Sequence, residues 1–288
     1  MAKKYELLKD DFVFHDDKKL HRIKALRDFW VHGQFVKAGD LGGYIEGKHN
    51  LSQNDDCWVG NNAQVYGGAY VYDNAWVGNN AQVYGNACIY DDAWVGDNAQ
   101  VYGGAEDYGE AGIYGGAKVY DEAWIHGNAQ VYGGAEVYGE AGIYGGAKVY
   151  DEAWIHGNAQ VYGEAEVYGE VEIYDKTEVH DKAHVFDDAR IYGRAKIYGE
   201  ACVYDGAWVY GDAKIYGETK VSGVVDVYGK AKVFGNARVY GNSTYRGDTT
   251  VCGKAQIYDN AQVLTYSCIQ GRTKVCGEEV CGYLSKAI

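Results

Sequence analysis

Apolar residues recur every six positions from Cys57 to Glu278, and the frame never slips. The copy at residues 63–68 reads AQVYGG and the next copy reads AYVYDN. This stretch holds 37 copies, in which the first position is Ala 28 times and the third position is Val or Ile 35 times. A repeat of this regularity determines the architecture of the chain.

Each copy predicts a short β-strand followed by a corner. The first and third positions point to one side of a strand, and the mostly polar second position points to the other. The fifth position is Gly, Asp or Asn in all copies but one, and these residues tolerate positive φ. Three copies close one triangular coil, and stacked coils bury the apolar side of each copy. We expect an all-β solenoid of about twelve coils, roughly 60 Å long at the ~4.8 Å spacing between strands.

Segments such as VGNNA at residues 59–63 and VGDNA at residues 95–99 resemble the hexapeptide repeat of left-handed parallel β-helix proteins. The resemblance spans residues 57–278 and implies a left-handed coil, which departs from the usual right-handed crossover between parallel strands. The fourth position is usually small in that family but is Tyr in 23 copies here. The Tyr-Gly-Asn-Ala style is similar to non-catalytic bacterial and prophage proteins of the polymer-forming type.

Residues 1–56 lie outside the repeat, and we interpret them as an N-terminal capping domain. The end of a coil is an exposed strand edge that attracts other chains, so terminal repeats need a cap. Phe29, Trp30 and Phe35 are expected to supply apolar bulk to this cap. Short strands are predicted at residues 5–8, 12–14 and 20–26.

The repeat weakens after Val263, and residues 279–288 form a thin C-terminal tail or cap. One helical turn is predicted at residues 283–287. Because this is little cover for the end of a coil, we expect it to dock on another molecule or a second copy of the chain.

The net charge of −14 is concentrated in one part of the chain. Residues 57–170 carry 2 Lys and Arg against 16 Asp and Glu, whereas residues 1–56 and residues 171–288 are each balanced. This argues against a nucleic acid or an anionic membrane as a partner, since both repel an acidic surface. No run of ~20 apolar residues predicts a membrane span, and residues 1–10 are polar rather than a secretory leader. Scattered cysteines, seven in number, are typical of reduced thiols in a cytoplasmic protein.

Residues 105–134 and 135–164 are nearly the same string. Each string is five copies long, which is not a multiple of the three that make a coil. The duplication therefore moves each side chain to a neighbouring face, so that His126 and His156 are equivalent in sequence yet lie on different faces. A site confined to one face would be scrambled, which indicates selection for length or for a property that all faces share.

Columns of residues three copies apart are expected to share a face, and they supply the candidate interaction surface. Where a column consists of aromatic residues, its rings are expected to stack as a ladder. Such a ladder stabilises the coil, and it also offers a platform for a glycan, a partner chain or a second copy. A column of Lys196, Lys214 and Lys232 suggests an anionic partner, because like charges in a column repel. The candidate residues are Trp58, Trp76, Trp94, Tyr66, Tyr84, Tyr102, Glu106, Glu136 and Glu166. The first ladder runs from Tyr66 to Tyr138 and resumes at Tyr174, Tyr192 and Tyr210.

Many hexapeptide β-helix proteins are acyltransferases, so an enzyme has to be considered. Resemblance to these acyltransferases implies a trimer, a catalytic His and a loop that leaves the coil. In this sequence no loop interrupts the 37 copies. His180 and His184 have no carboxylate partner that the pattern reveals. The scattered His residues do not match the three zinc ligands of the γ-type carbonic anhydrases. No phosphate-binding loop or nucleophile elbow is present in the sequence.

Two further features are interpreted as structural. Asp107 occupies an inward third position, where a carboxylate is costly, and its duplicate is Val137. Cys268, Cys276 and Cys281 lie close together, but their spacing matches no strong zinc pattern.

The sequence thus favours a cytoplasmic, non-enzymatic β-solenoid that requires no cofactor or metal. We expect a scaffold or self-associating rod, in the style of phage proteins, whose partner is a protein or a second copy. One alternative is a phage-type inhibitor that presses its acidic half onto a basic host protein. The other is an acyltransferase.

Overall fold

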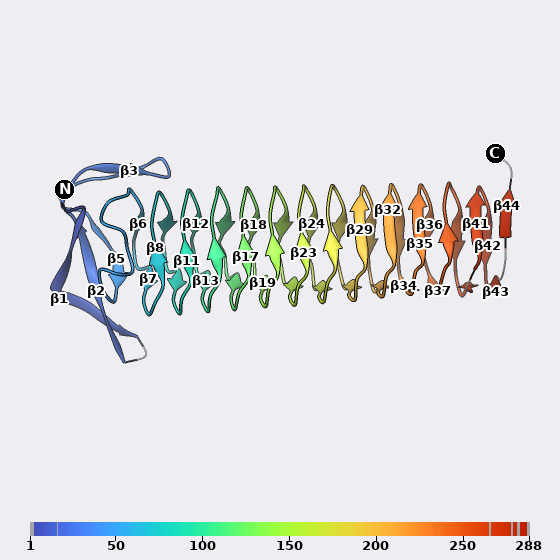
Figure 1. The fold of residues 1–288 in the computed structure, drawn as a ribbon, viewed down its shortest axis with the longest axis horizontal. Coiled ribbons are helices and arrows are strands. Elements are labelled where there is room, and N and C mark those ends of the chain that lie inside the picture. Colours follow the sequence, from blue (N-terminus) through green and yellow to red (C-terminus); the bar gives the residue numbers. More distant parts are fainter. Residues whose placement is uncertain (1–2, 16, 265, 278, 281–282, 287–288) are drawn as a thin grey trace. The chain divides into compact units, whose positions relative to one another are not determined.

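The computed structural model describes residues 3–15, 17–264, 266–277, 279–280 and 283–286. These residues form strands, turns and bends and no helix, as the repeat predicts. The chain divides into two compact units, residues 1–145 and residues 146–288. In each unit the six-residue copies wind into a parallel β-solenoid (Figure 1).

Within a coil, a two-residue strand alternates with a corner. In the copy at residues 63–68, Gln64 and Val65 form the strand, and both Ala63 and Val65 are fully buried. Gly67 turns the corner with φ of +69°, and Asp73 turns the next with φ of +54°. Gly, Asn and Asp are the residues that adopt this conformation at least cost. The predicted roles of the first, third and fifth positions are therefore confirmed.

Three sheets form the sides of the solenoid in residues 1–145. Gln64 pairs with Gln82 and Gln82 with Gln100, so the predicted coil of three copies is confirmed. The first sheet contains β1 (Tyr5–His15), β2 (Lys18–Ala25), β5 (Leu41–Ile45), β7 (Gln64–Val65), β10 (Gln82–Val83), β13 (Gln100–Val101), β16 (Lys118–Val119) and β19 (Glu136–Val137). The second contains β8 (Tyr70–Val71), β11 (Cys88–Ile89), β14 (Glu106–Asp107), β17 (Trp124–Ile125) and β20 (Gly142–Ile143). The third contains β6 (Trp58–Val59), β9 (Trp76–Val77), β12 (Trp94–Val95), β15 (Gly112–Ile113) and β18 (Gln130–Val131).

Residues 146–288 also wind around three sheets with the same register of three copies per coil. One sheet contains β22 (Trp154–Ile155), β25 (Glu172–Ile173), β28 (Arg190–Ile191), β31 (Trp208–Val209), β34 (Val224–Val227), β37 (Asn242–Tyr245), β40 (Gln262–Val263) and β43 (Glu279–Val280). Another contains β23 (Gln160–Val161), β26 (Glu178–Val179), β29 (Lys196–Gly199), β32 (Lys214–Gly217), β35 (Lys232–Gly235), β38 (Thr250–Val251), β41 (Cys268–Gly271) and β44 (Tyr283–Lys286). The last contains β21 (Lys148–Val149), β24 (Glu166–Val167), β27 (His184–Val185), β30 (Cys202–Tyr204), β33 (Lys220–Ser222), β36 (Arg238–Val239), β39 (Gln256–Tyr258) and β42 (Lys274–Cys276). The two units hold about 13 coils, close to the predicted twelve.

The helical turn predicted near the C-terminus is wrong. Residues 283–286 form β44, which pairs in parallel with β41 from Cys268↔Tyr283 to Gly271↔Lys286. Residue 287, the last of the predicted turn, lies outside the described residues. The register of β44 is offset from the period of the coil, since Tyr283, rather than Lys286, lies opposite Cys268.

The capping segment is a short antiparallel extension of the first sheet. A single strand, β1, includes both predicted runs at residues 5–8 and 12–14, and its pairing with β2 is irregular between Leu7 and Phe12. Strand β5 pairs antiparallel with β2 and parallel with β7, so it leads the chain from the cap into the first coil. A separate hairpin is formed by β3 (Phe29–Val31) and β4 (Gln34–Val36).

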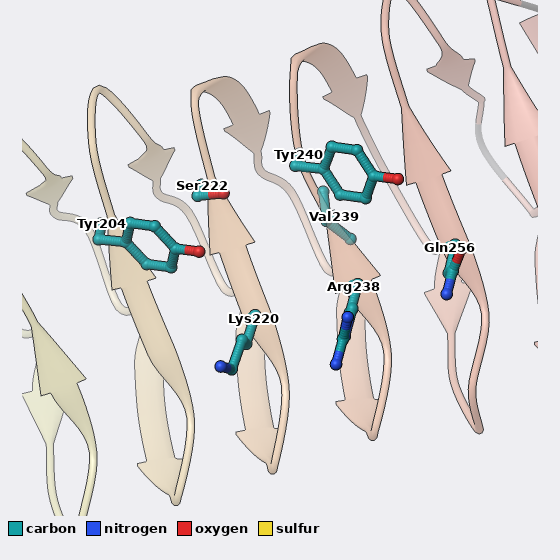
Figure 2. Close-up of a pocket in the computed structure, with 7 residues that line it drawn as sticks. All are labelled: Tyr204, Lys220, Ser222, Arg238, Val239, Tyr240 and Gln256. Carbon is teal, nitrogen blue, oxygen red and sulfur yellow. The ribbon is translucent and has the colours of Figure 1, made fainter.

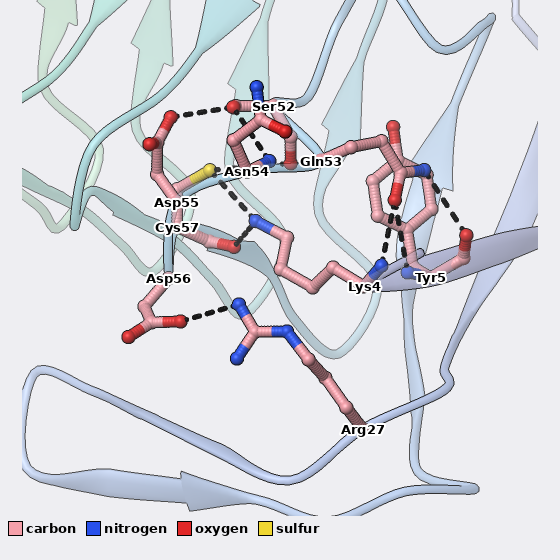
Figure 3. Close-up of polar contacts among 9 residues, drawn as sticks. All are labelled: Lys4, Tyr5, Arg27, Ser52, Gln53, Asn54, Asp55, Asp56 and Cys57. Carbon is pink, nitrogen blue, oxygen red and sulfur yellow. Dashed lines mark hydrogen bonds and ion pairs between the residues drawn. The ribbon is translucent and has the colours of Figure 1, made fainter. Parts of the chain in front are cut away.

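Buried polar contacts fix the cap to the first coil (Figure 3). The ammonium of Lys4 is buried and donates to the carbonyl oxygen of Cys57 at 2.7 Å and to its Sγ at 3.1 Å. Desolvation lowers the pKa of Lys4 and raises the pKa of the Cys57 thiol. Tyr5 Oη donates to the carbonyl of Leu51 at 2.7 Å. Because removing one partner would leave a buried polar group unsatisfied, this junction has a defined geometry.

Candidate functional site

The tyrosines of the fourth position stack as continuous ladders within each unit. From Tyr66 to Tyr138 the ring centroids lie 4.8–5.1 Å apart and the planes are within 4° of parallel. Within residues 146–288, a ladder runs through Tyr174, Tyr192 and Tyr210 with ring centroids 4.8–5.0 Å apart. The predicted ladders are confirmed, and their spacing equals that between strands in a sheet. Desolvation raises the pKa of several of these phenols, as for Tyr72 at about 12, so they remain neutral.

The tryptophans at the head of the third sheet are mostly covered, contrary to the solvent exposure that the pattern predicts. Trp58 and Trp76 are buried, and Trp94 is 47% exposed. The β3–β4 hairpin is the cause at Trp58, since Phe29 packs edge-on against its ring at 5.4 Å. Gly60 leaves room for the ring of Trp76, because a Cβ on Gly60 would lie 2.9 Å from its Cζ2. Of these three tryptophans, Trp94 is the one left open to a partner.

Tyr66, the first rung of its ladder, is also covered. The ring of His15, at the end of β1, lies 4.9 Å from the ring of Tyr66, which is buried. Tyr84 and Tyr102 are half-buried between their neighbours in the ladder. Of the predicted tyrosines, these two therefore offer ring edges but no open ring face.

An exposed aromatic pair on the cap, Trp30 and Phe35, was not predicted from the sequence, where both residues were expected to supply apolar bulk. Trp30 is 63% exposed and Phe35 is 49% exposed, and they pair across the hairpin with ring centroids 5.0 Å apart. At the hairpin tip, the ring of His32 lies 6.4 Å from Trp94. We call Trp30 and Phe35 the aromatic patch. The alternation of buried Phe29 and Val31 with exposed Trp30 is the signal that could have revealed it.

The three predicted glutamates do not form one acidic face. Glu106 lies on the second sheet of residues 1–145 and Glu136 on the first, as the frame of the duplication requires. Glu136 is paired with Lys118 at 2.8 Å, and Glu166 on β24 is paired with Lys148 at 3.2 Å. Glu106 accepts a hydrogen bond from Tyr90 Oη at 3.2 Å. Lysine partners therefore offset the charges that Glu136 and Glu166 could offer to a basic protein.

The lysine column is aligned as predicted, but one member is neutralised. Lys196, Lys214 and Lys232 are in register on β29, β32 and β35. Lys196 Nζ lies 2.7 Å from a carboxylate oxygen of Glu178. In the described part of the chain no ion pair includes Lys214 or Lys232, so these two cations are available to attract an anion.

The histidines that an acyltransferase would draw on have carboxylate neighbours, contrary to the expectation from the pattern. His180 Nδ1 lies 3.2 Å from Asp181, and His184 Nδ1 lies 3.6 Å from Glu166. The His180 ring is also stacked between Tyr162 and Tyr198 at 4.8 and 5.0 Å. Since it fills a rung of a ladder, its faces are not available to a substrate.

Asp107 is fully buried on the axis of the coil, and neither carboxylate oxygen has a hydrogen-bond partner. Burial raises the pKa of Asp107 well above its ordinary value, because desolvation favours the neutral acid over the carboxylate. Its neighbours in register are Ile89 and Ile125. An acid enclosed by apolar residues does not reach a substrate.

No metal centre is found in the described part of the chain, where no three or more His, Cys, Asp or Glu side chains converge. Cys276 Sγ lies 2.9 Å from an oxygen of Asp259, and Cys268 is half-buried on β41. Cys281, the third member of the predicted cluster, lies outside the described residues. Among the described residues no helix is found that is long and apolar enough to cross a membrane.

One comparison with known proteins supports the fold. A family model described as the YdcK beta solenoid repeat matches residues 81–97, which run from β10 to β12 and nearly complete one coil. A search of curated proteins gives no match. The similarity therefore concerns the repeat and its solenoid fold, and it assigns no activity.

Proposed function

We propose that this solenoid is a non-catalytic scaffold that binds protein, with a second copy of the chain as its first partner. The aromatic patch is the observation that carries the proposal. Trp30 and Phe35 expose large apolar rings side by side on the outer face of the hairpin, whereas Phe29 on the same hairpin is buried. Exposed aromatic groups of this kind mark interfaces, because burying them removes apolar area from water.

The contacts of the hairpin support this interpretation. Its inner face is anchored on Trp58 through Phe29, so its outer face is presented on a fixed support. A pre-organised surface loses little conformational entropy on binding. Free thiols at six described cysteines are consistent with a cytoplasmic setting, which is part of the proposal, as is the phage-like origin suggested by the repeat style.

Light scattering of the full chain over a range of concentrations tests self-association. We expect the wild type to gain mass with concentration and a Trp30→Ser/Phe35→Ser variant to keep the monomer mass. Trp124→Ser is the matched control, because Trp124 is 55% exposed but lies on β17, away from the hairpin. A wild type that stays monomeric at every concentration would remove the second copy as the partner.

The acidic composition of residues 57–170 favours a second candidate, an inhibitor that binds a basic host protein. Capture of a basic protein that is lost on Glu106→Gln, Glu136→Gln and Glu166→Gln substitution would support it. If capture instead depends on Trp30 and Phe35, the aromatic patch is the interface and this candidate fails.

The proposal that the chain is not an enzyme has its own test. The carboxylate neighbours of His180 and His184 are the observation that keeps an acyltransferase under consideration. We expect titration calorimetry with acetyl coenzyme A to show no heat of binding. Saturable binding abolished by His184→Ala would overturn the non-catalytic assignment.

A further inference from the structure

One aromatic ladder in residues 146–288 is interrupted by a single missing rung. On the sheet that contains β30, β33 and β36, Phe186 stacks on Tyr204 at 4.7 Å, and Tyr240 stacks on Tyr258 at 5.3 Å. Ser222 occupies the rung between Tyr204 and Tyr240. In the sequence of the 37 copies, Ser222 is the one non-aromatic fourth position with an aromatic residue one coil before and one coil after it.

The missing rung leaves a slot the size of one ring. Tyr204 and Ser222 are direct partners in register, and Tyr240 is one further coil along. Two strand spacings put the flanking rings roughly 9.6 Å apart. Elsewhere in the ladders, three rings occupy two such spacings with 4.7–5.0 Å between centroids. A planar guest could therefore stack on both walls as a tyrosine would.

The slot opens into a cavity of about 430 Å³. Figure 2 shows Ser222 between the rings of Tyr204 and Tyr240, with Lys220 and Arg238 at the starts of β33 and β36. Ser222 is only 9% exposed, so it forms the floor, whereas Tyr240 is exposed at the rim.

Two cations border the slot. Lys220 and Arg238 are adjacent in register and both exposed, and no ion pair of the described residues includes either of them. Glu200 and Glu218 border a neighbouring hollow together with Lys220, Arg238 and Lys254. Side by side, like charges repel, and an anion bound between Lys220 and Arg238 would relieve that repulsion.

We propose that this slot is a binding site for a small planar aromatic anion. The aromatic ring inserts between Tyr204 and Tyr240 in place of the missing rung, and its phosphate or carboxylate is held by Lys220 and Arg238. Stacking on two faces supplies the affinity for the ring, and the cation pair orients it. The site lies within residues 146–288 and is independent of the aromatic patch, which lies within residues 1–145.

Titration of the full chain with phenyl phosphate tests the proposal, with calorimetry as the readout. We expect phenyl phosphate to bind at least roughly tenfold more tightly than inorganic phosphate or phenol, since only it uses both features. Benzoate and adenosine monophosphate, as parallel probes, distinguish a carboxylate source and a nucleotide source of the same chemistry. Equal affinity for phenyl phosphate and inorganic phosphate would overturn insertion of the ring.

Ser222→Tyr fills the rung and is expected to abolish binding of phenyl phosphate. Cys252→Tyr is the matched control: it adds a tyrosine at the fourth position that follows β38, next to the end of the ladder at Phe234, and leaves the slot open. Binding that survives Ser222→Tyr would place the ligand elsewhere and overturn the proposal.

Lys220→Gln/Arg238→Gln provides a second test if Ser222→Tyr does not fold, because both replaced side chains are exposed. We expect this variant to weaken binding of phenyl phosphate by roughly tenfold or more, while binding of phenol is unchanged. Unchanged affinity for phenyl phosphate would show that the cation pair does not hold the anion, and the proposal would fail.

Discussion

At the scale of single residues, the interior of each coil admits very little variation. Ala at the first position and Val or Ile at the third are fully buried in copy after copy. Asp107 breaks this rule, with two unsatisfied carboxylate oxygens in an apolar environment. Since the duplicated Val137 occupies an equivalent inward position, the coil does not require an acid there.

Asp107→Val is expected to raise the free energy of unfolding at pH 7 by roughly 2–4 kcal/mol, because it replaces an unsatisfied acid with apolar surface. The raised pKa gives a second signature. The wild type should gain stability as the pH falls through that pKa, because the unfolded carboxyl remains charged until about pH 4. Urea unfolding at several pH values measures both effects. A variant less stable than the wild type at pH 7 would indicate a structural role for the carboxyl.

Gly60 is expected to be needed for its lack of a side chain. A Cβ at this position would meet the ring of Trp76 at 2.9 Å, so Gly60→Ala should destabilise the fold by roughly 1–3 kcal/mol through overpacking. Gly112→Ala is the control on the same sheet, because its Cβ would make an ordinary 3.4 Å contact with Tyr114. Thermal unfolding compares the two. Equal effects would mean that backbone entropy, rather than the Trp76 ring, decides the outcome.

The buried and exposed classes of residue were predictable at this scale, but the burial of Trp58 and Trp76 was not. The six-residue period states which way a side chain points relative to its own strand. It contains no information on whether another segment covers that side. Phe29 covers Trp58 through a contact between the cap and the first coil, which no local pattern encodes.

At the scale of elements, the ladder is the unit that turns a two-residue strand into a stable structure. A strand this short makes few contacts of its own, and stacking places a ring against the coil before and the coil after. Histidine substitutes for tyrosine in a ladder at His126, which lies 4.8 Å from Tyr108 and 4.9 Å from Tyr144. Burial lowers the pKa of this imidazole.

His126 is expected to make stability depend on pH. Its pKa is lower in the folded chain than the ordinary 6.5, so protons bind preferentially to the unfolded state and stability falls as the pH drops below about 6.5. His126→Tyr should reduce this loss, and His126→Phe is a control without a titratable group. Urea unfolding at pH 7.5 and pH 5.5 measures the difference. Identical pH dependence in wild type and variant would contradict the assignment.

The sequence predicted the strands, corners and ladders because the same six-residue rule is repeated many times. It did not predict the missing rung at Ser222 as a slot, although the residue is visible in the sequence. Ser222 can be recognised as a gap between two rings only when Tyr204 and Tyr240 are known to be its neighbours in space. The left-handed winding was inferred from resemblance and stays a prediction.

At the scale of the whole molecule, acidic residues outnumber basic residues, and the excess is unevenly distributed along the chain. All of the net charge of −14 arises from residues 57–170. Asp92 and its acidic neighbours Asp91 and Asp73 line one corner hollow in residues 1–145. Repulsion among such groups is larger in the compact state than in the unfolded chain.

Salt is therefore expected to stabilise the protein. Raising NaCl from 10 mM to 200 mM should increase the free energy of unfolding by about 1 kcal/mol, since the Debye length falls below the separation of many carboxylates. Asp92→Lys/Glu122→Lys, which replaces two exposed acids, should show a smaller gain. Urea titrations at the two salt concentrations give the comparison. A wild type that loses stability in salt would show that attractive ion pairs outweigh the repulsion.

The placement of Glu106 and Glu136 on different sheets has a consequence for insertions and deletions of repeat copies during evolution. They are equivalent residues in neighbouring copies of the duplicated string, yet they look out in different directions. An insertion or deletion of six or twelve residues preserves the backbone of the coil but moves the outward side chains that follow it to another face. A change of eighteen residues, which is one whole coil, leaves them on their original face. An insertion before Tyr204 in any multiple of six residues would therefore leave the slot at Ser222 intact. An insertion or deletion between Tyr204 and Tyr240 would keep both rings on one face only if it comprised whole coils, and it would then change the number of rungs between them.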